Sequence, residues 1–325
     1  MLVLSDAEIR SVLTHRAAVD SQRTALVAAA DGQVTAVGSM SSADPADDSL
    51  VFVHTGAIAG RTGVTCKFGL QVPGNAARGL PTVHGVVMVL RPGTGEPLAC
   101  LNGGTVTALR TAAGVGAAAE VLARPDASRL GLVGSGVQAR EAARMIGAVR
   151  SLSQIAVFSP SAERSAGLAA DLQAELGVPA AAVASATELA GHADVIVIAT
   201  TSREPVVRGA WLRPGVTVLT VGSYEPDRRE LDLAATVRAD ATFADDPLKA
   251  MSSCGMLVEA RERGIGLPVG PVSVGAVIAG RRQGRRGPDE VVLFHCMGLG
   301  VQDASLAWTV VELAVAGGVG KMVEF

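Results

Sequence analysis

The chain has 325 residues, a net charge of -3 and 49% apolar residues, yet only 3% of its residues are aromatic. This length suits one large domain or two smaller ones and leaves ample material for a hydrophobic core. A mean hydropathy of +0.37 with 18% charged residues excludes a disordered chain. Weak negative charge and few rings argue against nucleic-acid binding, so the arginine-rich stretch 281–287 is expected to be a solvated loop.

The sequence carries no sign of secretion or membrane insertion. No apolar run reaches the roughly 20 residues that cross a bilayer, and Ser5 and Glu8 have the spacing of a helix capping box. Four scattered cysteines without paired spacing argue against a disulfide framework and against a metal site. We expect a soluble, cytoplasmic protein that binds neither membranes nor metal ions.

The first third of the chain mixes strands and helices. Residues 86–90 and 98–101 flank RPGTGEP, which predicts an antiparallel hairpin, and the polar stretch 41–49 is expected to be a loop. Residues 105–123 predict a helix rich in small side chains.

From residue 129 onward, short β-branched runs alternate with helical segments, as in a parallel sheet covered on both faces. The predicted strands are 130–133, 154–158, 181–183, 195–199, 216–221 and 291–294, and the helices are 137–149, 161–176 and 302–316. The fold class is therefore α/β. We expect two domains, one of residues 1–115 joined by the C-terminal segment 302–325, the other of residues 116–301.

The strongest local motif lies in RLGLVGSGVQAREAARMI, residues 129–146. Gly134, Gly136 and Ala139 form G-x-G-x-x-A between a predicted strand and a predicted helix. The first glycine permits a tight turn, the second lets the backbone approach a pyrophosphate, and the small third residue allows close packing. This context predicts a Rossmann dinucleotide-binding domain; the alternative is a structural glycine turn in another α/β fold.

The end of the second strand of that domain bears on the choice of cofactor. An NAD site usually has Asp or Glu there, whereas this chain has Ser159, Ser161 and Arg164. Hydroxyls with a guanidinium suit a 2′-phosphate, so NADPH is favoured over NADH. The alternative is that Ser161 only caps the next helix while Ser159 and Arg164 face solvent.

Several motifs occur in an order that resembles the ornithine cyclodeaminase/μ-crystallin family. They include CKFGLQVPGNAARGLPT, LNGGTVTALRTAAGVGAAA, LVGSGVQA, VGSYEPDRRELD and LFHCMGLGVQDA, and they span residues 66–303. The resemblance implies a Rossmann domain joined to a second α/β domain that binds substrate and forms a homodimer. Members include cyclodeaminases, cyclic-imine reductases and amino-acid dehydrogenases, all with a nicotinamide cofactor.

The family's site residues carry over position by position. Lys67 and Arg110 match its binders of the substrate carboxylate, a role that suits an ammonium and a bidentate guanidinium; the alternative is ordinary surface charge. Residues expected to face the cofactor, besides those of the glycine turn and Ser159, are Thr82, Thr111, Val137, Gln138, Thr200, Val221, Cys296 and Met297. Met297 is equally compatible with plain core packing. Of the histidines, His54 is expected to be a surface or loop residue and His295 to be structural.

Two departures from the family pattern decide which member function the sequence favours. The family usually carries an arginine upstream of the lysine, but here no Lys or Arg lies between Arg23 and Arg61, so Arg61 or Arg78 are candidates to replace it. Where cyclodeaminases have an aspartate, this chain has Tyr224, a poor base but a competent proton donor. Alternatively, Tyr224 is a steric wall, with Glu225 or Asp227 handling the proton.

The sequence thus favours an NADPH-dependent reductase of a small imine, with Lys67, Arg110 and Tyr224 as the catalytic residues. The first alternative is an ornithine or amino-acid cyclodeaminase that uses NAD catalytically and releases ammonia. The second is a non-catalytic, crystallin-like protein that binds the cofactor without turnover.

Overall fold

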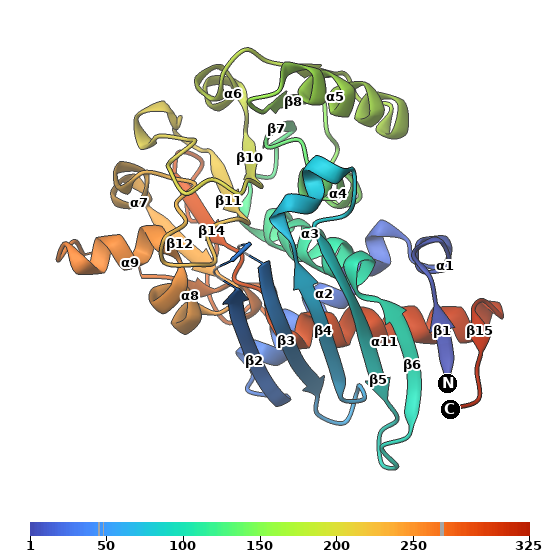
Figure 1. Ribbon diagram of the computed structural model, residues 1–325. Coiled ribbons are helices and arrows are strands. Elements are labelled where there is room, and N and C mark those ends of the chain that lie inside the picture. Colours follow the sequence, from blue (N-terminus) through green and yellow to red (C-terminus); the bar gives the residue numbers. More distant parts are fainter. Residues whose placement is uncertain (45, 48, 267–269) are drawn as a thin grey trace. The chain divides into compact units, whose positions relative to one another are not determined.

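The computed structural model describes residues 1–44, 46–47, 49–266 and 270–325. The chain divides into two compact units (Figure 1). Unit 1 comprises Met1–Arg110 and Leu299–Phe325, and unit 2 comprises Thr111–Gly298. One boundary falls inside the long helix α3, Gly103–Leu122, and the other falls just before the C-terminal helix α11.

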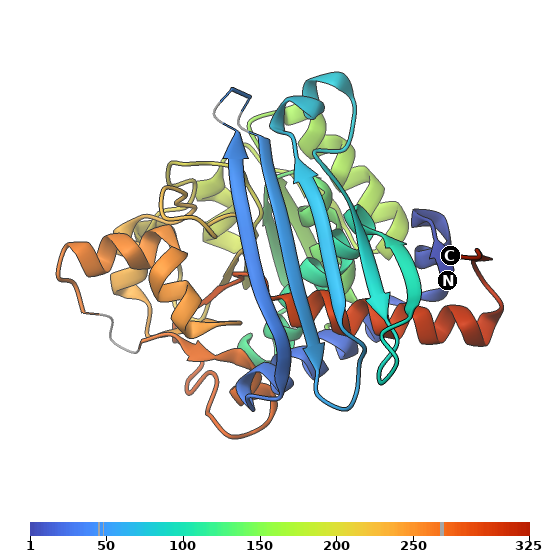
Figure 2. The same ribbon diagram turned by 60° about the horizontal axis from the view of Figure 1, so that its bottom comes forward.

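Unit 1 is built on a seven-stranded mixed sheet, as far as the described residues go, in the order β15-β1-β6-β5-β4-β3-β2. Its elements are β1 (Leu2–Leu4), α1 (Asp6–Val12), α2 (His15–Ala30), β2 (Val34–Asp44), β3 (Ser49–Ile58), β4 (Thr65–Gln71), the 3-10 helix η1 (Pro73–Arg78), β5 (Val83–Leu90), β6 (Pro97–Asn102), α11 (Gly300–Gly317) and β15 (Lys321–Met322). Helix α11 crosses one face of this sheet behind β3 and β4, and the opposite face is turned toward the viewer in Figure 2.

Helix α11 can lie directly on β3 because both backbones carry glycine where they meet. A Cβ atom on Gly56 would lie 2.5 Å from the Gly300 carbonyl carbon, and one on Gly300 would lie 2.0 Å from the Thr55 carbonyl oxygen. Any larger side chain would push the helix away. This contact brings the first turn of α11 onto the inner face of β3 and β4.

In unit 2 the described residues form an eight-stranded sheet in the order β13-β12-β14-β11-β10-β7-β8-β9, and all of their strand pairs are parallel. Its strands are β7 (Arg129–Val133), β8 (Gln154–Phe158), β9 (Ala180–Ala182), β10 (Val195–Ile198), β11 (Thr217–Thr220), β12 (Ala241–Ala244), β13 (Val272–Ser273) and β14 (Val292–His295). The helices are α4 (Val137–Gly147), α5 (Ala162–Leu176), α6 (Ala186–His192), η2 (Gly209–Trp211), α7 (Leu233–Arg238), α8 (Pro247–Ser253), α9 (Gly255–Glu262) and α10 (Val274–Ile278).

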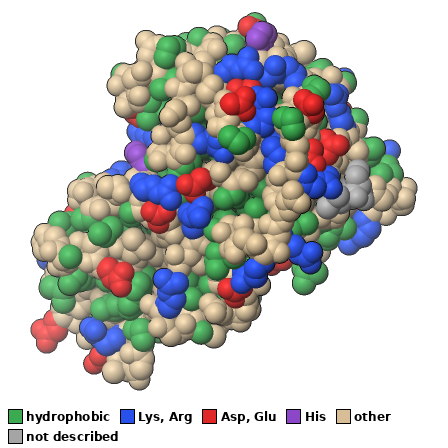
Figure 3. All heavy atoms as spheres, turned by 180° about the vertical axis from the view of Figure 1, so that it is seen from behind, with side chains coloured by type: hydrophobic (Ala, Val, Ile, Leu, Met, Phe, Trp, Pro, Cys, Tyr) green, Lys and Arg blue, Asp and Glu red, His purple; other side chains and the backbone are tan. Residues whose placement is uncertain are grey.

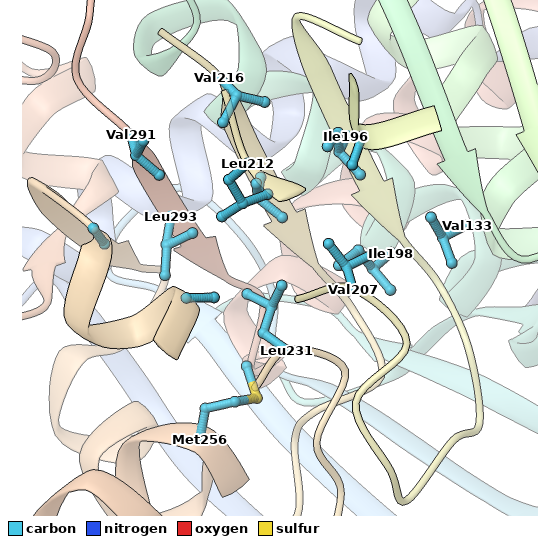
Figure 4. Packing of buried hydrophobic residues seen from close by; sticks show 14 of the residues in the cluster. Val133, Ile196, Ile198, Val207, Leu212, Val216, Leu231, Met256, Val291 and Leu293 are labelled. Carbon is cyan, nitrogen blue, oxygen red and sulfur yellow. The ribbon is translucent and has the colours of Figure 1, made fainter. Parts of the chain in front are cut away.

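The strands of unit 2 are apolar along their whole length because both faces are covered. All four residues of β10, β11, β12 and β14 are buried. Figure 4 shows Ile196 and Ile198 of β10 and Leu293 of β14 in one cluster of buried apolar side chains, with Leu212 lying between them. Continuous burial of this kind requires continuous apolar runs rather than alternation.

The fold class expected from the sequence, α/β with a parallel Rossmann-type sheet and a second α/β part, is confirmed. The hairpin around RPGTGEP is present as β5 and β6, and Ser5 and Glu8 form a capping box. The loop expected over residues 41–49 is wrong at both ends, because β2 continues to Asp44 and β3 begins at Ser49. Within that stretch, positions 45 and 48 lie outside the described residues.

The described surface mixes charges of both signs. On the face drawn in Figure 3, Lys and Arg side chains are interspersed with Asp and Glu side chains. Some of the charged side chains of the described residues form ion pairs, as Arg144 does with Glu175. Among the described helices, none is both long enough and apolar enough to cross a membrane.

Candidate active site

A buried ionic cluster occupies the inner face of the unit 1 sheet. Lys67 Nζ on β4 lies 2.8 Å from Asp303 Oδ1, and Arg110 Nε on α3 lies 3.1 Å from the same oxygen. The exposed fractions of the Lys67, Arg110 and Asp303 side chains are 1%, 8% and 1%. Ordinary surface charge, the alternative interpretation of Lys67 and Arg110, is therefore wrong.

Asp303 holds the two cations together. Its position in the first turn of α11 places the carboxylate near the positive end of the helix dipole. Burial by itself would raise the pKa of Asp303, but the Lys67 ammonium and the Arg110 guanidinium outweigh it and hold that pKa well below its usual value. The carboxylate is therefore ionised, and two cations with one anion leave the cluster a net positive charge.

His54 is the fourth member of this cluster. It lies on β3 directly opposite Lys67 in the strand register, and its Nδ1 is 3.6 Å from Asp303 Oδ2. The surface or loop position expected for His54 is wrong, because the side chain is only 19% exposed. Burial lowers the pKa of His54, although Asp303 opposes the shift. The Arg61 and Arg78 side chains, both exposed, have no recorded contact with the cluster.

Unit 2 contains the glycine turn that the motif predicts, between β7 and α4. Gly134 has a φ of +115°, and a Cβ atom there would lie 2.4 Å from the Ala199 carbonyl oxygen. Gly136 is the N-cap of α4; among the described residues no side chain caps this end, and a Cβ on Gly136 would meet nothing within 4 Å. Ala139 is fully buried, as close helix–strand packing requires. The helix N-terminus is therefore open to an anionic group.

The serines after β8 form a local hydroxyl network. Ser159 Oγ lies 3.0 Å from Ser135 Oγ and 2.8 Å from Ser165 Oγ. Ser161 caps α5 by accepting a hydrogen bond from the Arg164 amide, and the Arg164 side chain is exposed. Ser159 thus links the end of β8 to the glycine turn.

Two buried carboxylates that sequence reasoning missed hold strand ends of the unit 2 sheet. Thr200 lies just beyond β10. Glu230 accepts a 2.8 Å hydrogen bond from the Thr200 amide and a 3.0 Å hydrogen bond from the Thr200 hydroxyl. It also accepts from the amides of Val221 and Gly222, 3.1 and 2.7 Å long, just beyond β11. Ser223 adds a fifth hydrogen bond. Burial raises the pKa of Glu230 to about 7 despite these donors.

Asp245 holds the end of β14, the strand on the other side of β11 from β10. It follows β12 and accepts hydrogen bonds from the amides of Met297 and Gly298, just beyond β14. Burial raises the pKa of Asp245, and the two amides oppose the shift. Glu230 and Asp245 therefore fix the segments that carry Thr200, Val221 and Met297, which are the carboxyl ends where parallel sheets bind ligands.

Tyr224 lies in the loop that Glu230 anchors. Its ring packs against the unit 2 core, and the Arg228 guanidinium lies 5.3 Å from the ring centroid. The neighbouring carboxylates are engaged elsewhere, since Glu225 pairs with Arg228 and Asp227 pairs with Arg203. Neither carboxylate is therefore as available for proton transfer as its position in the sequence suggested.

The remaining expected positions divide by unit. Thr82 is an exposed residue of unit 1, whereas Thr111, Cys296 and Met297 are buried in unit 2. In the first turn of α4, Val137 is exposed and the Gln138 side-chain oxygen is a buried atom without a hydrogen-bond partner. His295 is fully buried, which lowers its pKa to about 4, in line with a structural role. Within the described ranges, no group of three His, Cys, Asp or Glu side chains is placed to hold a metal ion.

Comparison with known proteins places this geometry in context. A Delta(1)-pyrroline-2-carboxylate reductase from Bacillus thuringiensis subsp. konkukian is 31% identical over the full length of both chains. The structure of the Thermococcus litoralis Delta(1)-pyrroline-2-carboxylate reductase in complex with NADH and L-proline matches with a TM-score of 0.94 at 28% identity, covering 99% of this chain and 100% of that one. An archaeal alanine dehydrogenase dimer with bound NAD matches with a TM-score of 0.91 at 27% identity, covering 100% and 99%. The model of the ornithine cyclodeaminase/mu-crystallin family matches residues 1–318, so the chain belongs to that family.

Proposed function

We propose that this protein is an NAD(P)-dependent reductase that converts the C=N bond of a small imine carrying a carboxylate into an amine. A cyclic ketimine carboxylate such as pyrroline-2-carboxylate is the substrate class that fits best. One hydride adds to the imine carbon and one proton adds to the nitrogen, which balances the reaction. The names of the relatives support this class of chemistry.

The observation that carries the proposal is the buried cluster of Lys67, Arg110 and Asp303. Burying two cations is unfavourable unless anions neutralise them. Asp303 contributes one negative charge beside the two cations, so the cluster suits the carboxylate of a substrate as a second anion. Lys67 and Arg110 then bind and orient the substrate by charge-assisted hydrogen bonds.

The residues of unit 2 fit a nicotinamide dinucleotide. The open N-terminus of α4 behind Gly134 and Gly136 suits a pyrophosphate, with Val137 and Gln138 in its first turn. The segments beyond the strands, with Thr200, Val221, Cys296 and Met297, lie at the edge where such sheets bind ligands, and Thr111 belongs to the same unit. When bound, the reduced nicotinamide supplies the hydride.

The Tyr224 hydroxyl donates the proton that the imine nitrogen requires, or it forms a hydrogen bond with the iminium group. The loop that carries it is anchored by Glu230 through Gly222 and Ser223, so its backbone is held in place. A phenol donates a proton more readily than it abstracts one at neutral pH. This property favours reduction of a preformed C=N bond over cyclodeamination, which needs a base.

We further propose that NADPH is the preferred cofactor. The segment after β8 offers the hydroxyls of Ser159 and Ser161 and, in the first turn of α5, Arg164, with no carboxylate before Glu163. A carboxylate at the strand end would repel a 2′-phosphate. An affinity for NADH more than about tenfold above that for NADPH, or 1.4 kcal/mol, would contradict this preference.

Unit 1 is proposed to be the substrate-binding and dimerisation part. The sheet face opposite α11 carries the cross-strand row Met40, Val53, Phe68 and Val86 on β2 to β5. Met40, Phe68 and Val86 are 69%, 54% and 45% exposed, and contiguous apolar exposure marks an interaction surface. Phe68→Lys is expected to convert a dimer into a monomer in light scattering, with Lys321→Glu as the control.

The deciding experiment follows NADPH and NADH oxidation with pyrroline-2-carboxylate, piperideine-2-carboxylate, and 2-oxo acids plus amines, and measures ammonia release from ornithine in parallel. One NADPH consumed per product supports the proposal. Ammonia release without net cofactor consumption would indicate a cyclodeaminase instead. Tight NADPH binding without turnover on any substrate would indicate a crystallin-like binding protein.

Lys67→Met is expected to raise KM for the imine at least tenfold while leaving NADPH affinity unchanged.

A further inference from the structure

We propose that His54 is a third, titratable arm of the carboxylate-binding cluster, so that binding of an anionic substrate is coupled to protonation of this histidine. The inference rests on the proposed function, because it names how that same site holds its carboxylate. It also accounts for the absence of any Lys or Arg between Arg23 and Arg61.

The strand register puts His54 in the right place. Its position on β3 pairs with Lys67 on β4, so both side chains project from the same face of the sheet. Nδ1 faces Asp303 Oδ2 at 3.6 Å, and among the described residues neither of these buried atoms has a partner within hydrogen-bond distance. A proton on Nδ1 would satisfy both atoms after a small approach.

The exposed part of the cluster belongs mainly to His54. Its side chain is 19% exposed, against 8% for Arg110 and 1% for Lys67. Since Nδ1 itself is buried, the accessible surface lies on the rest of the side chain. A carboxylate that enters the cluster therefore meets His54, and the second nitrogen of a protonated ring can donate a hydrogen bond to it.

The charges around His54 set the sign of the pH dependence. Lys67 faces it from β4, Arg110 from α3 and Asp303 from α11, while β2 places the uncharged Ser39 opposite it. Burial and the two cations lower the pKa of His54, so the ring is neutral at neutral pH in the ligand-free protein. A bound carboxylate adds the negative charge that favours the protonated ring, and binding therefore takes up a proton.

The test measures binding of pyrrole-2-carboxylate by calorimetry between about pH 6 and pH 8, where this ligand keeps a single negative charge. Affinity for the wild-type protein should rise about tenfold toward the acidic end, with proton uptake visible as a dependence of heat on buffer. His54→Gln should bind about tenfold more weakly without pH dependence. His54→Arg should restore affinity and make it pH-independent. The neutral pyrrole-2-carboxamide should show no pH dependence.

The matched control is His84→Gln, because His84 is an exposed histidine on β5 of the same sheet, two strands away from β3. It should keep the wild-type affinity and pH dependence. Equal, pH-independent binding by the wild type and His54→Gln would overturn the inference, even if the protein reduces imines. Conversely, absent turnover with intact pH-linked carboxylate binding would reject the reductase proposal and leave the role of His54 standing.

Discussion

Lys67 Nζ donates a 2.8 Å hydrogen bond to Asp303 Oδ1, joining two side chains that are each only 1% exposed and 236 positions apart in the chain. The pair ties the C-terminal helix α11 to strand β4, so a residue near the end of the chain completes a site that begins near its start. Under the proposed function Asp303 is both structural and functional, since its carboxylate would orient Lys67 and Arg110 for a ligand.

Asp303→Asn is therefore expected to destabilise the fold by about 3–5 kcal/mol, because it leaves two buried cations without their anion. Urea unfolding measures the loss. The matching change in an exposed pair, Glu96→Gln beside Arg91, should cost less than about 1 kcal/mol. A similar small loss for Asp303→Asn would mean that the cluster does not hold Lys67 and Arg110 in place.

Glu230→Gln tests the carboxylate that anchors the ends of β10 and β11. The NH₂ group of the glutamine would face amides and hydroxyls that now donate hydrogen bonds to Glu230. Each buried polar group left unsatisfied costs about 1–3 kcal/mol. We expect lower stability and at least tenfold weaker NADPH binding, with carboxylate binding unchanged. Glu204→Gln, at an exposed glutamate, is the control. Unaltered NADPH affinity would confine Glu230 to a purely structural role.

The raised pKa of Glu230 also predicts a pH dependence. A carboxyl whose pKa rises from 4.5 to about 7 on folding binds its proton more tightly in the folded state. Its stabilising contribution is complete below the unfolded pKa and is lost as the pH rises through about 7. Unfolding free energies at about pH 5 and about pH 8 should therefore differ more for the wild type than for Glu230→Gln.

The parts of the molecule that the sequence predicted well are those set by local patterns. The glycine turn and the strands around it follow from continuous apolar runs and a short motif, so β8 was predicted at its observed bounds. The sequence did not predict the strand β2, and its polar end, up to Asp44, was expected to be a loop because only the pairing with β3 identifies it as a strand.

The missed site residues share a different cause. Asp303 looks like an ordinary first-turn acid and Glu230 like part of a surface turn, because their partners are distant in the chain or are backbone amides. A lone carboxylate at the start of the otherwise apolar helix α11 was the available signal for Asp303. For His54, only the pairing register of β3 with β4 reveals its neighbours.

Tyr224→Phe isolates the proton on the imine nitrogen. If the phenol donates that proton, kcat should fall by about 10²–10⁴-fold and the alkaline limb of the pH profile should change. NADPH affinity should stay the same, because the ring and its packing against Arg228 are retained. Full turnover with an unchanged pH profile would show that Tyr224 is only a wall of the site.

Alanine at the two glycines of the turn separates folding from cofactor binding. Gly136 has an extended backbone and open space around a Cβ, so Gly136→Ala should keep the stability of the wild type. Its methyl group would nevertheless project at the uncapped start of α4, and NADPH affinity should fall at least tenfold. Fluorescence titration with NADPH and thermal unfolding, measured on the same preparations, give both quantities.

Gly134→Ala should lower both the stability of the fold and the affinity for NADPH. Its φ of +115° disfavours any side chain, and the new methyl would collide with the Ala199 carbonyl oxygen; strain of this kind costs about 1–3 kcal/mol. Gly167→Ala is the control, because that glycine lies inside α5 with free space around it and alanine favours helices. If Gly136→Ala binds NADPH as tightly as the wild type, the pyrophosphate does not lie against the N-terminus of α4. The alanine methyl group would occupy the space proposed for the phosphate oxygens.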